Sequence, residues 1–152
     1  MALDLKQTIA TVKGLIIFGW IVATIRLFLD LSVPEISMYF GVYYAMPLAY
    51  LYYGLTGKMD DLPWSRLAIA MVVVGFFVWF IPNTITYTAA QFMGWDSGRF
   101  SAEIQDSTIG KILSGLSISG VTFVAGAGWS VVSGSLLIYL PRRFRKQNPH
   151  TP

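Results

Sequence analysis

Hydrophobic positions along the chain gather in four long runs, separated by three polar joints and followed by a basic tail. A helix needs about 20 mostly apolar residues to cross roughly 30 Å of hydrocarbon. The pattern therefore predicts four membrane-spanning helices, over residues 12–31, 36–54, 67–92 and 109–140. We expect one transmembrane domain covering residues 1–152, an all-α four-helix bundle with short loops.

The joints contain residues that commonly begin or end helices. Ser32 and Glu35 have the spacing of a capping box, which predicts that the second helix starts there. Asp61 and Pro63 offer a cap and a first-turn proline for the third helix, and Gly94 should end it. In the longest joint, residues 101–106 are expected to form a short interfacial helix.

Lys and Arg are distributed unevenly between the joints. They concentrate in the N-terminal segment, in the 55–66 joint and in the basic tail at 141–152, whereas the other side has only Arg99 and, at the start of the fourth run, Lys111. Basic residues favour the cytoplasmic side of a membrane, so we expect both termini to be cytoplasmic, in the plasma membrane or bacterial inner membrane. The tail is then explained by topology and anionic lipid, and no nucleic-acid partner is expected.

Composition supports the membrane assignment and excludes several kinds of chemistry. The chain is 55% hydrophobic and 12% charged, with a mean hydropathy of +0.58. It has no cysteine, and its one histidine, His150, lies in a Pro-rich tail. Thiolate chemistry is therefore excluded, and a metal or haem site is not expected. Lipid, quinone or carotenoid remain the cofactor candidates.

The fourth run is unusual in its glycine and serine content. Gly126, Ser130 and Gly134 recur every four residues on one helical face, and Gly115 and Ser119 repeat that spacing. Lipid gives helices no hydrophobic drive to associate, so small residues that allow close approach are needed. We predict that these five residues pack this helix against other helices. Small residues on its other sides raise the alternative that it also docks on another subunit.

The second run is rich in tyrosine. Tyr43, Tyr44 and Tyr50 lie away from its ends. A buried phenol needs a hydrogen-bond partner, so these three residues predict polar neighbours on adjacent helices or a bound ligand.

Polar residues of the other runs fall at the outer depth of the membrane. Arg26 precedes Asp30 by one helical turn, and the third run carries a polar stripe after Pro82. One interpretation is an interfacial pair with a snorkelling arginine. The alternative is an outward-open ligand pocket. Its predicted lining consists of Arg26, Tyr43, Asn83, Tyr87 and Gln91.

Three functions are compatible with these observations. The first is a non-enzymatic accessory or scaffolding subunit that packs against a larger membrane complex. The second is an oligomeric transporter of small molecules or ions, or a protein that binds lipid, quinone or carotenoid in the outer pocket. The third is an intramembrane enzyme acting on lipid, for which Asp60, Asp61 and Glu103 are the available acids. No catalytic constellation is apparent, because the serines lack a histidine base.

Overall fold

The computed structural model describes residues 5–96, 98–100 and 103–147. Within these residues the secondary structure is entirely helical. The elements are α1 (Leu5–Ser32), α2 (Pro34–Ser37), α3 (Val42–Thr56), α4 (Trp64–Gly75), the π-helix η1 (Phe76–Phe80), α5 (Ile81–Met93), the 3₁₀-helix η2 (Gly98–Phe100), α6 (Thr108–Trp129), the π-helix η3 (Ser130–Gly134) and α7 (Ser135–Gln147).

Three of the helical rods are long and apolar enough to cross a membrane. They are Leu5–Ser32, the continuous α4–η1–α5 rod at Trp64–Met93, and Thr108–Arg145 within the α6–η3–α7 rod. The second hydrophobic run is interrupted, because Gly41 adopts an extended conformation between α2 and α3. The 15 residues of α3 rise only about 22 Å. The structure therefore supports three spanning helices and does not by itself establish a fourth.

Both predicted side-chain caps are wrong, whereas the predicted glycine at the end of the third helix is confirmed. Helix α1 continues through Ser32, so the N-cap of α2 is Val33, and the N-cap of α4 is Pro63 instead of Asp61. Neither cap has a side-chain hydrogen bond. Gly94 ends α5 in the left-handed conformation with φ 68°.

The longest joint and the tail also differ from expectation. Residues 103–106 are not helical, and residues 101–102 of the predicted interfacial helix lie outside the described residues. The short helix of this joint is η2 instead. In the tail, α7 carries the last rod past residue 140 to Gln147. His150 lies outside the described residues.

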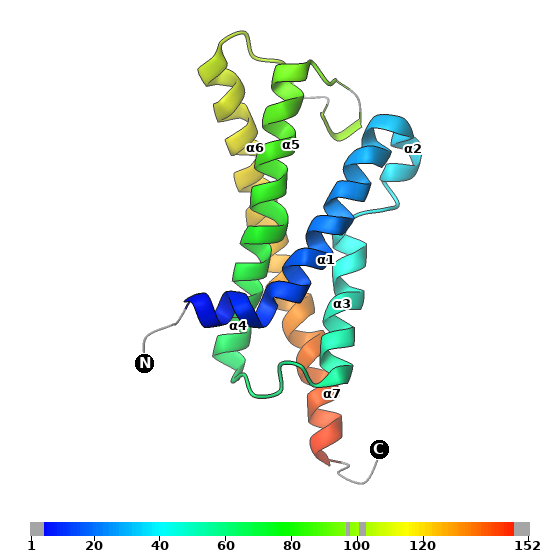
Figure 1. Cartoon of the computed structure of the whole chain (residues 1–152), viewed down its shortest axis with the longest axis vertical. Helices are drawn as coiled ribbons and strands as arrows, with labels where there is room; N and C mark the ends of the chain where they lie inside the picture. Colours follow the sequence, from blue (N-terminus) through cyan, green and yellow to red (C-terminus); the bar gives the residue numbers. More distant parts are fainter. Residues whose placement is uncertain (1–4, 97, 101–102, 148–152) are drawn as a thin grey trace.

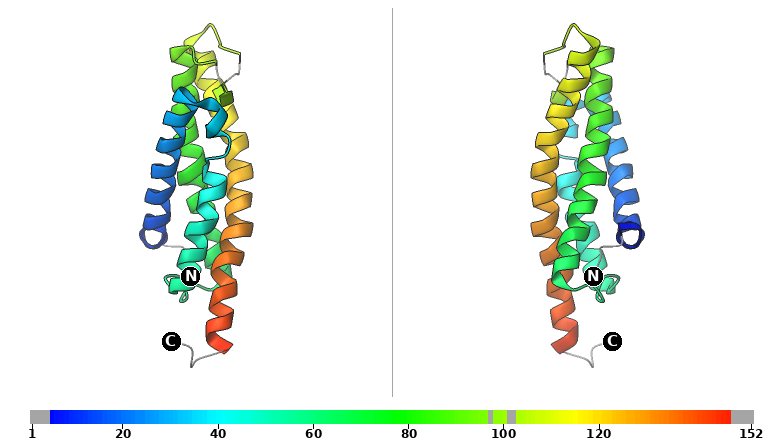
Figure 2. Two further views of the ribbon diagram at one scale, coloured as in Figure 1. Left: turned by 90° about the vertical axis from the view of Figure 1, so that its right-hand side faces the viewer. Right: turned by 90° about the vertical axis from the view of Figure 1, so that its left-hand side faces the viewer.

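The rods pack side by side along the long axis of the molecule (Figure 1). We call the end with α2 and the α5–α6 joint the upper end, and the end with the α3–α4 joint and α7 the lower end. Two opposite views, each at right angles to that of Figure 1, show α1 and α6 on opposite sides, with α3 and the α4–η1–α5 rod between them (Figure 2). The first turns of α1 run across the bundle before the helix turns upward (Figure 1).

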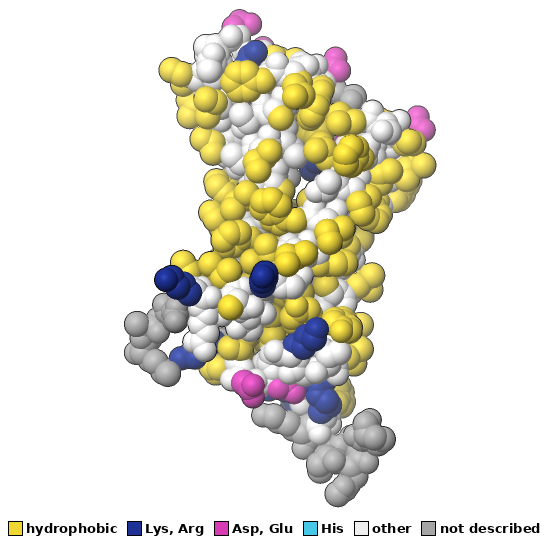
Figure 3. All heavy atoms as spheres, viewed as in Figure 1, with side chains coloured by type: hydrophobic (Ala, Val, Ile, Leu, Met, Phe, Trp, Pro, Cys, Tyr) yellow, Lys and Arg dark blue, Asp and Glu magenta, His cyan; other side chains and the backbone are white. Residues whose placement is uncertain are grey.

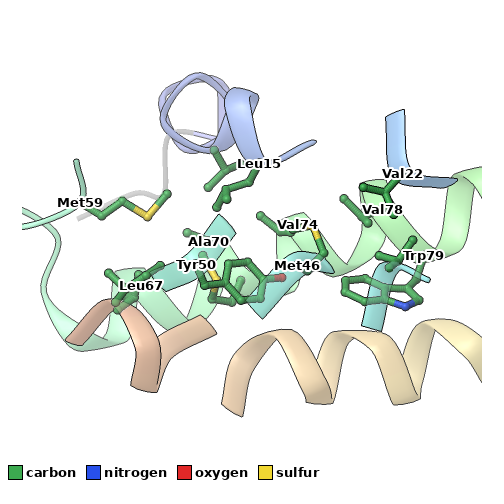
Figure 4. Packing of buried hydrophobic residues seen from close by; sticks show 14 residues of the cluster. Leu15, Val22, Met46, Tyr50, Met59, Leu67, Ala70, Val74, Val78 and Trp79 are labelled. Carbon is green, nitrogen blue, oxygen red and sulfur yellow. The ribbon is translucent and has the colours of Figure 1, made fainter. Parts of the chain in front are cut away.

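The core fills the space between α1, α3, α4 and η1. Leu15, Met46, Met71 and Val74 are fully buried there, and Figure 4 shows how these helices contribute side chains to one cluster. The Tyr50 hydroxyl is also buried and donates a hydrogen bond to Ser130 Oγ at 2.9 Å. This confirms the expectation of a polar neighbour for Tyr50.

Arginines of α7 hold the lower end together. Arg145 donates to the carbonyl oxygens of Gly54 and Leu55 at the end of α3, and it binds both oxygens of Asp60 at 2.7 and 2.8 Å. Arg142 donates to the Leu62 carbonyl oxygen at 2.6 Å. Because cations favour the negative end of a helix dipole, Arg145 stabilises the end of α3. Two arginines of the basic tail therefore have structural partners.

Hydrophobic side chains cover the middle of the surface, and most charged side chains of the face in Figure 3 gather toward its two ends. Exposed large apolar side chains occur on all the long helices, among them Phe28, Leu48, Ile85 and Val121. This uncharged belt is the surface expected for helices that face lipid.

Candidate functional site

A cavity of about 300 Å³ lies between α1, the first turn of α3 and the η1–α5 segment, in the half of the molecule toward the upper end. In Figure 3, a hollow in this half of the surface shows Lys or Arg atoms between hydrophobic side chains. Its apolar lining consists of Trp20, Ala23, Leu27, Val42, Val78, Trp79, Pro82 and Ile85. Its polar lining consists of Thr24, Arg26, Tyr43, Asn83, Thr86, Tyr87, Arg99 and Thr122.

Four of the five residues predicted to bind a ligand line this one cavity. They come from three separate rods: Arg26 from α1, Tyr43 from α3, and Asn83 and Tyr87 from α5. Gln91 does not line it. The Gln91 amide instead donates to the Glu103 carbonyl oxygen and accepts from the Gln105 N–H, which ties the α5–α6 joint to α5.

An acidic residue behind the cavity joins two arginines that line it. Asp30 is 1% exposed, and its Oδ2 lies 2.6 Å from Arg99 Nε and 3.9 Å from Arg26 Nε. The separation between Arg26 and Asp30 is too long for a hydrogen bond, so their attraction is between charges, whereas Arg99 is in direct contact with the carboxylate. Burial lowers the pKa of the Arg99 guanidinium, and the Asp30 carboxylate opposes that shift.

Arg99 is the site residue that sequence reasoning missed. It lies in η2, and in the sequence it counts only as one of two basic residues on the outer side. The spacing of Arg26 and Asp30 suggested a self-sufficient pair, but the structure brings Arg99 closer to Asp30 than Arg26 is. The pattern of α1 alone reveals Arg26 and Asp30 but not Arg99, which comes from η2.

Hydrogen bonds fix one wall of the cavity. The Asn83 amide donates to Thr122 Oγ1 of α6 at 3.0 Å, and its oxygen accepts from Arg99 Nη1 at 3.4 Å. The Arg99 guanidinium also lies over the Tyr87 ring, 5.6 Å from its centroid. This wall is a bonded seam, and the space next to it remains open.

The π-helix η1 positions two tryptophans that line the cavity. The Trp20 indole of α1 donates to the Phe77 carbonyl oxygen at 2.8 Å, which fastens α1 to η1. Trp79 packs its ring against Gly126 of α6 and is 2% exposed (Figure 4). Within the described part of the chain, its Nε1 has no hydrogen-bond partner. Single π turns inside α-helices are frequent at functional sites.

A second hollow of about 570 Å³ meets the first at Arg26 and Tyr43. It lies between α3 and the end of α6, and Tyr44 and Trp129 line it. Tyr44 is 67% exposed, so the adjacent helices do not bury its phenol as expected. The Arg26 side chain therefore lines both hollows.

The five predicted packing residues are all buried inside this chain's own bundle. A Cβ atom on Gly126 would lie 2.3 Å from the Trp79 ring, and one on Gly115 would lie 2.2 Å from Thr88 Oγ1. Glycine is required at both positions because the neighbouring rod comes this close.

The other three packing residues approach α3, α4 and their own helix. Ser130 accepts from Tyr50, and Gly134 lies against Met71. Ser119, fully buried, donates to the carbonyl oxygen of Gly115.

The acids considered for an enzyme do not form one site. Asp60 binds Arg145 at the lower end, whereas Glu103 belongs to the α5–α6 joint at the upper end. Among the described residues there is no group of His, Asp or Glu side chains that could hold a metal ion.

Comparison with known proteins adds no relative: no family model, no curated protein and no solved structure matches this chain.

Proposed function

We propose that the chain is a multi-pass protein of the plasma membrane or bacterial inner membrane with four crossings and both termini on the cytoplasmic side. Three spanning rods, the uncharged belt and the excess of basic residues near the lower end support this topology. In this proposal α3 makes the remaining crossing, with α2 and the 38–41 turn extending its depth. The cavity then lies in the outer half of the membrane.

The function that the geometry supports best is non-enzymatic binding of a small molecule in the cavity between α1, α3 and α5. The observation that carries this proposal is the convergence of Arg26, Tyr43, Asn83 and Tyr87 from three rods on a single hollow. Ligand sites are typically apolar hollows with a few convergent polar groups, and this cavity has that composition. Ionisable residues at membrane depth are costly and usually serve a function.

Photo-crosslinking in cells tests this proposal. A benzophenone amino acid placed at Leu27, which lines the cavity, should capture one discrete small molecule. The matched control is Ile21, which is 53% exposed on the same helix outside the cavity lining, and which should capture only bulk lipid. Mass spectrometry of the adducts reads out the result. The same spread of adducts at both positions would contradict the proposal.

A second candidate function, an accessory subunit of a larger membrane complex, is favoured by the outer face of α6. Gly120 and Gly128 there have no neighbour within 4 Å of an added Cβ, and Val121 and Val124 are 73% and 72% exposed. Small residues and valines suit close helix contacts in lipid.

Co-purification in mild detergent tests the subunit proposal. Gly128→Leu should release a partner that the unmodified chain retains, because it adds bulk in open space without disturbing the bundle. Leu48→Phe, at a position 69% exposed on α3, should retain that partner. Recovery of the unmodified chain as a clean monomer would exclude this function.

A further inference from the structure

We propose that the ligand of this cavity is an anionic amphiphile, whose acidic headgroup is bound beside Arg26 and whose apolar chain lies against Leu27, Val78 and Trp79. This inference rests on the proposed binding function and names the class of molecule bound. Three independent features of the cavity support it: its charge, its hydrogen-bond donors and its opening.

The charges around the cavity do not balance. Two guanidinium groups, Arg26 and Arg99, line it, and among the described residues no carboxylate does. Asp30 can neutralise only one of them, and it lies nearer to Arg99. An unpaired charge is expensive in a medium of low dielectric constant. A bound anion next to Arg26 would restore neutrality and could form charge-assisted hydrogen bonds.

The hydrogen-bond donors available near Arg26 lack acceptors. Among the described residues, the buried Arg26 Nε has no hydrogen-bond partner. Val42 and Tyr43 form the first turn of α3, where backbone N–H groups have no partner within the helix, and α3 has no side-chain cap. The positive end of the α3 dipole favours an anion at the same place. An acceptor-only group such as a carboxylate or phosphate matches this set.

A glycine at the start of α3 makes room for the Arg26 guanidinium. A Cβ atom on Gly41 would lie 2.8 Å from Arg26 Nη1, so the absence of a side chain there allows the guanidinium to reach the backbone. The Arg26 side chain therefore extends from α1 to the start of α3, where it lines both hollows.

The opening of the cavity faces the apolar belt. Ile85 is 58% exposed and Trp20 is 41% exposed, and both line the cavity between α1 and α5. A molecule that enters between these helices comes from the side, where lipid would lie. The apolar residues that surround the remaining space suit a hydrocarbon chain, because transfer of a chain to an apolar site is favourable. A fully polar anion would make no favourable contact with these apolar walls.

Calorimetric titration of the protein in phosphatidylcholine nanodiscs tests the inference, with empty nanodiscs as the blank for partitioning. The probes are decanoate, decyl phosphate, decanol and inorganic phosphate. The two acidic amphiphiles should bind at least about tenfold more tightly than decanol, and whichever of them binds better distinguishes a carboxylate from a phosphate headgroup. Inorganic phosphate alone should bind much more weakly.

Substitutions of Arg26 connect this preference to the proposed contact. Arg26→Gln should weaken the binding of both acids about tenfold and leave decanol binding unchanged, which also shows that the variant is folded. Arg26→Lys should retain the preference. Lys111→Gln, which removes a cation of α6 that does not line the cavity, should behave as the unmodified protein.

The other outcomes separate the two proposals. If decanol binds as tightly as decanoate, the acidic headgroup is wrong and the binding function stands. If inorganic phosphate binds as tightly as decyl phosphate, the apolar chain is wrong. If none of the amphiphiles binds, both proposals fail. Equal loss in Arg26→Gln and Lys111→Gln would show nonspecific attraction and overturn the assignment to Arg26.

Discussion

At the scale of single residues, Asp30 supplies the negative charge beside the arginines of the cavity. Its carboxylate is 1% exposed and lies beside both arginines that line the cavity, nearer to Arg99. Removing one partner of a buried ion pair leaves an uncompensated charge. The free-energy cost of that charge exceeds the stabilisation that the pair provided. The position of this single side chain therefore has consequences for both stability and binding.

Asp30→Asn should lower the free energy of unfolding by about 3 kcal/mol. Titration with a denaturing detergent, followed by helical circular dichroism, measures this quantity. Adding Arg99→Gln to that variant should recover part of the loss, because the unpaired guanidinium is then also removed. Asp96→Asn, at an exposed acid of the α5–α6 joint, is the matched control and should have little effect. Equal stability of the Asp30 and Asp96 variants would contradict this account.

At this scale the sequence indicates which residues share a helix or a depth, but it does not place a loop residue that folds back onto the bundle. Depth and spacing brought Arg26, Asn83 and Tyr87 together, since each lies near the same end of its rod. Arg99 could not be placed, because η2 reaches Asp30 only through the tertiary fold. Gln91 continued the polar stripe by spacing, yet its amide bonds to the adjacent joint.

At the scale of elements, α6 has two faces with opposite requirements for glycine. Gly126 meets the Trp79 ring, whereas Gly128, two residues later, faces open space. The small-residue pattern predicted close packing but could not assign a partner to each face. A stripe of small residues does not indicate which helix packs against it. In the structure, Gly115 and Gly126 both face this chain's own helices.

The two glycines make a matched experiment. Gly126→Ala should lower the free energy of unfolding by about 1–3 kcal/mol, because overpacking shifts the indole or the backbone. Gly128→Ala should be neutral or stabilising by up to about 1 kcal/mol, because alanine is the better helix former and the site is empty. Both are measured by the same detergent titration. A larger loss at Gly128 than at Gly126 would contradict the arrangement of α6.

The second hydrophobic run shows why helix number was harder to predict than helix type. Its length and composition predicted one continuous span, and residues 34–56 are indeed largely helical. The chain turns at 38–41 because Gly41 is extended, a backbone choice that hydropathy does not reveal. The capping predictions failed similarly, since Ser32 became the last residue of α1.

At the scale of the whole molecule, the proposed topology requires α3 to cross the membrane. Because the chain lacks cysteine, single cysteines can report sidedness without further changes. Tyr39→Cys and Asp106→Cys should react with an impermeant maleimide in intact cells. Asp61→Cys and Arg143→Cys should react only after the membrane is permeabilised. Reaction of Tyr39→Cys and Asp61→Cys from the same side would show that α3 does not cross.

Binding of a small molecule between α1, α3 and α5 is the claim that joins these scales, and native mass spectrometry of the purified protein tests it most directly. The unmodified chain should retain one bound small molecule. Ala23→Phe, which adds a ring inside the cavity lining, should carry none. Ala125→Phe, which adds the same ring on the exposed face of α6, should retain it. Identical spectra for the two variants, with or without a bound molecule, would contradict the account.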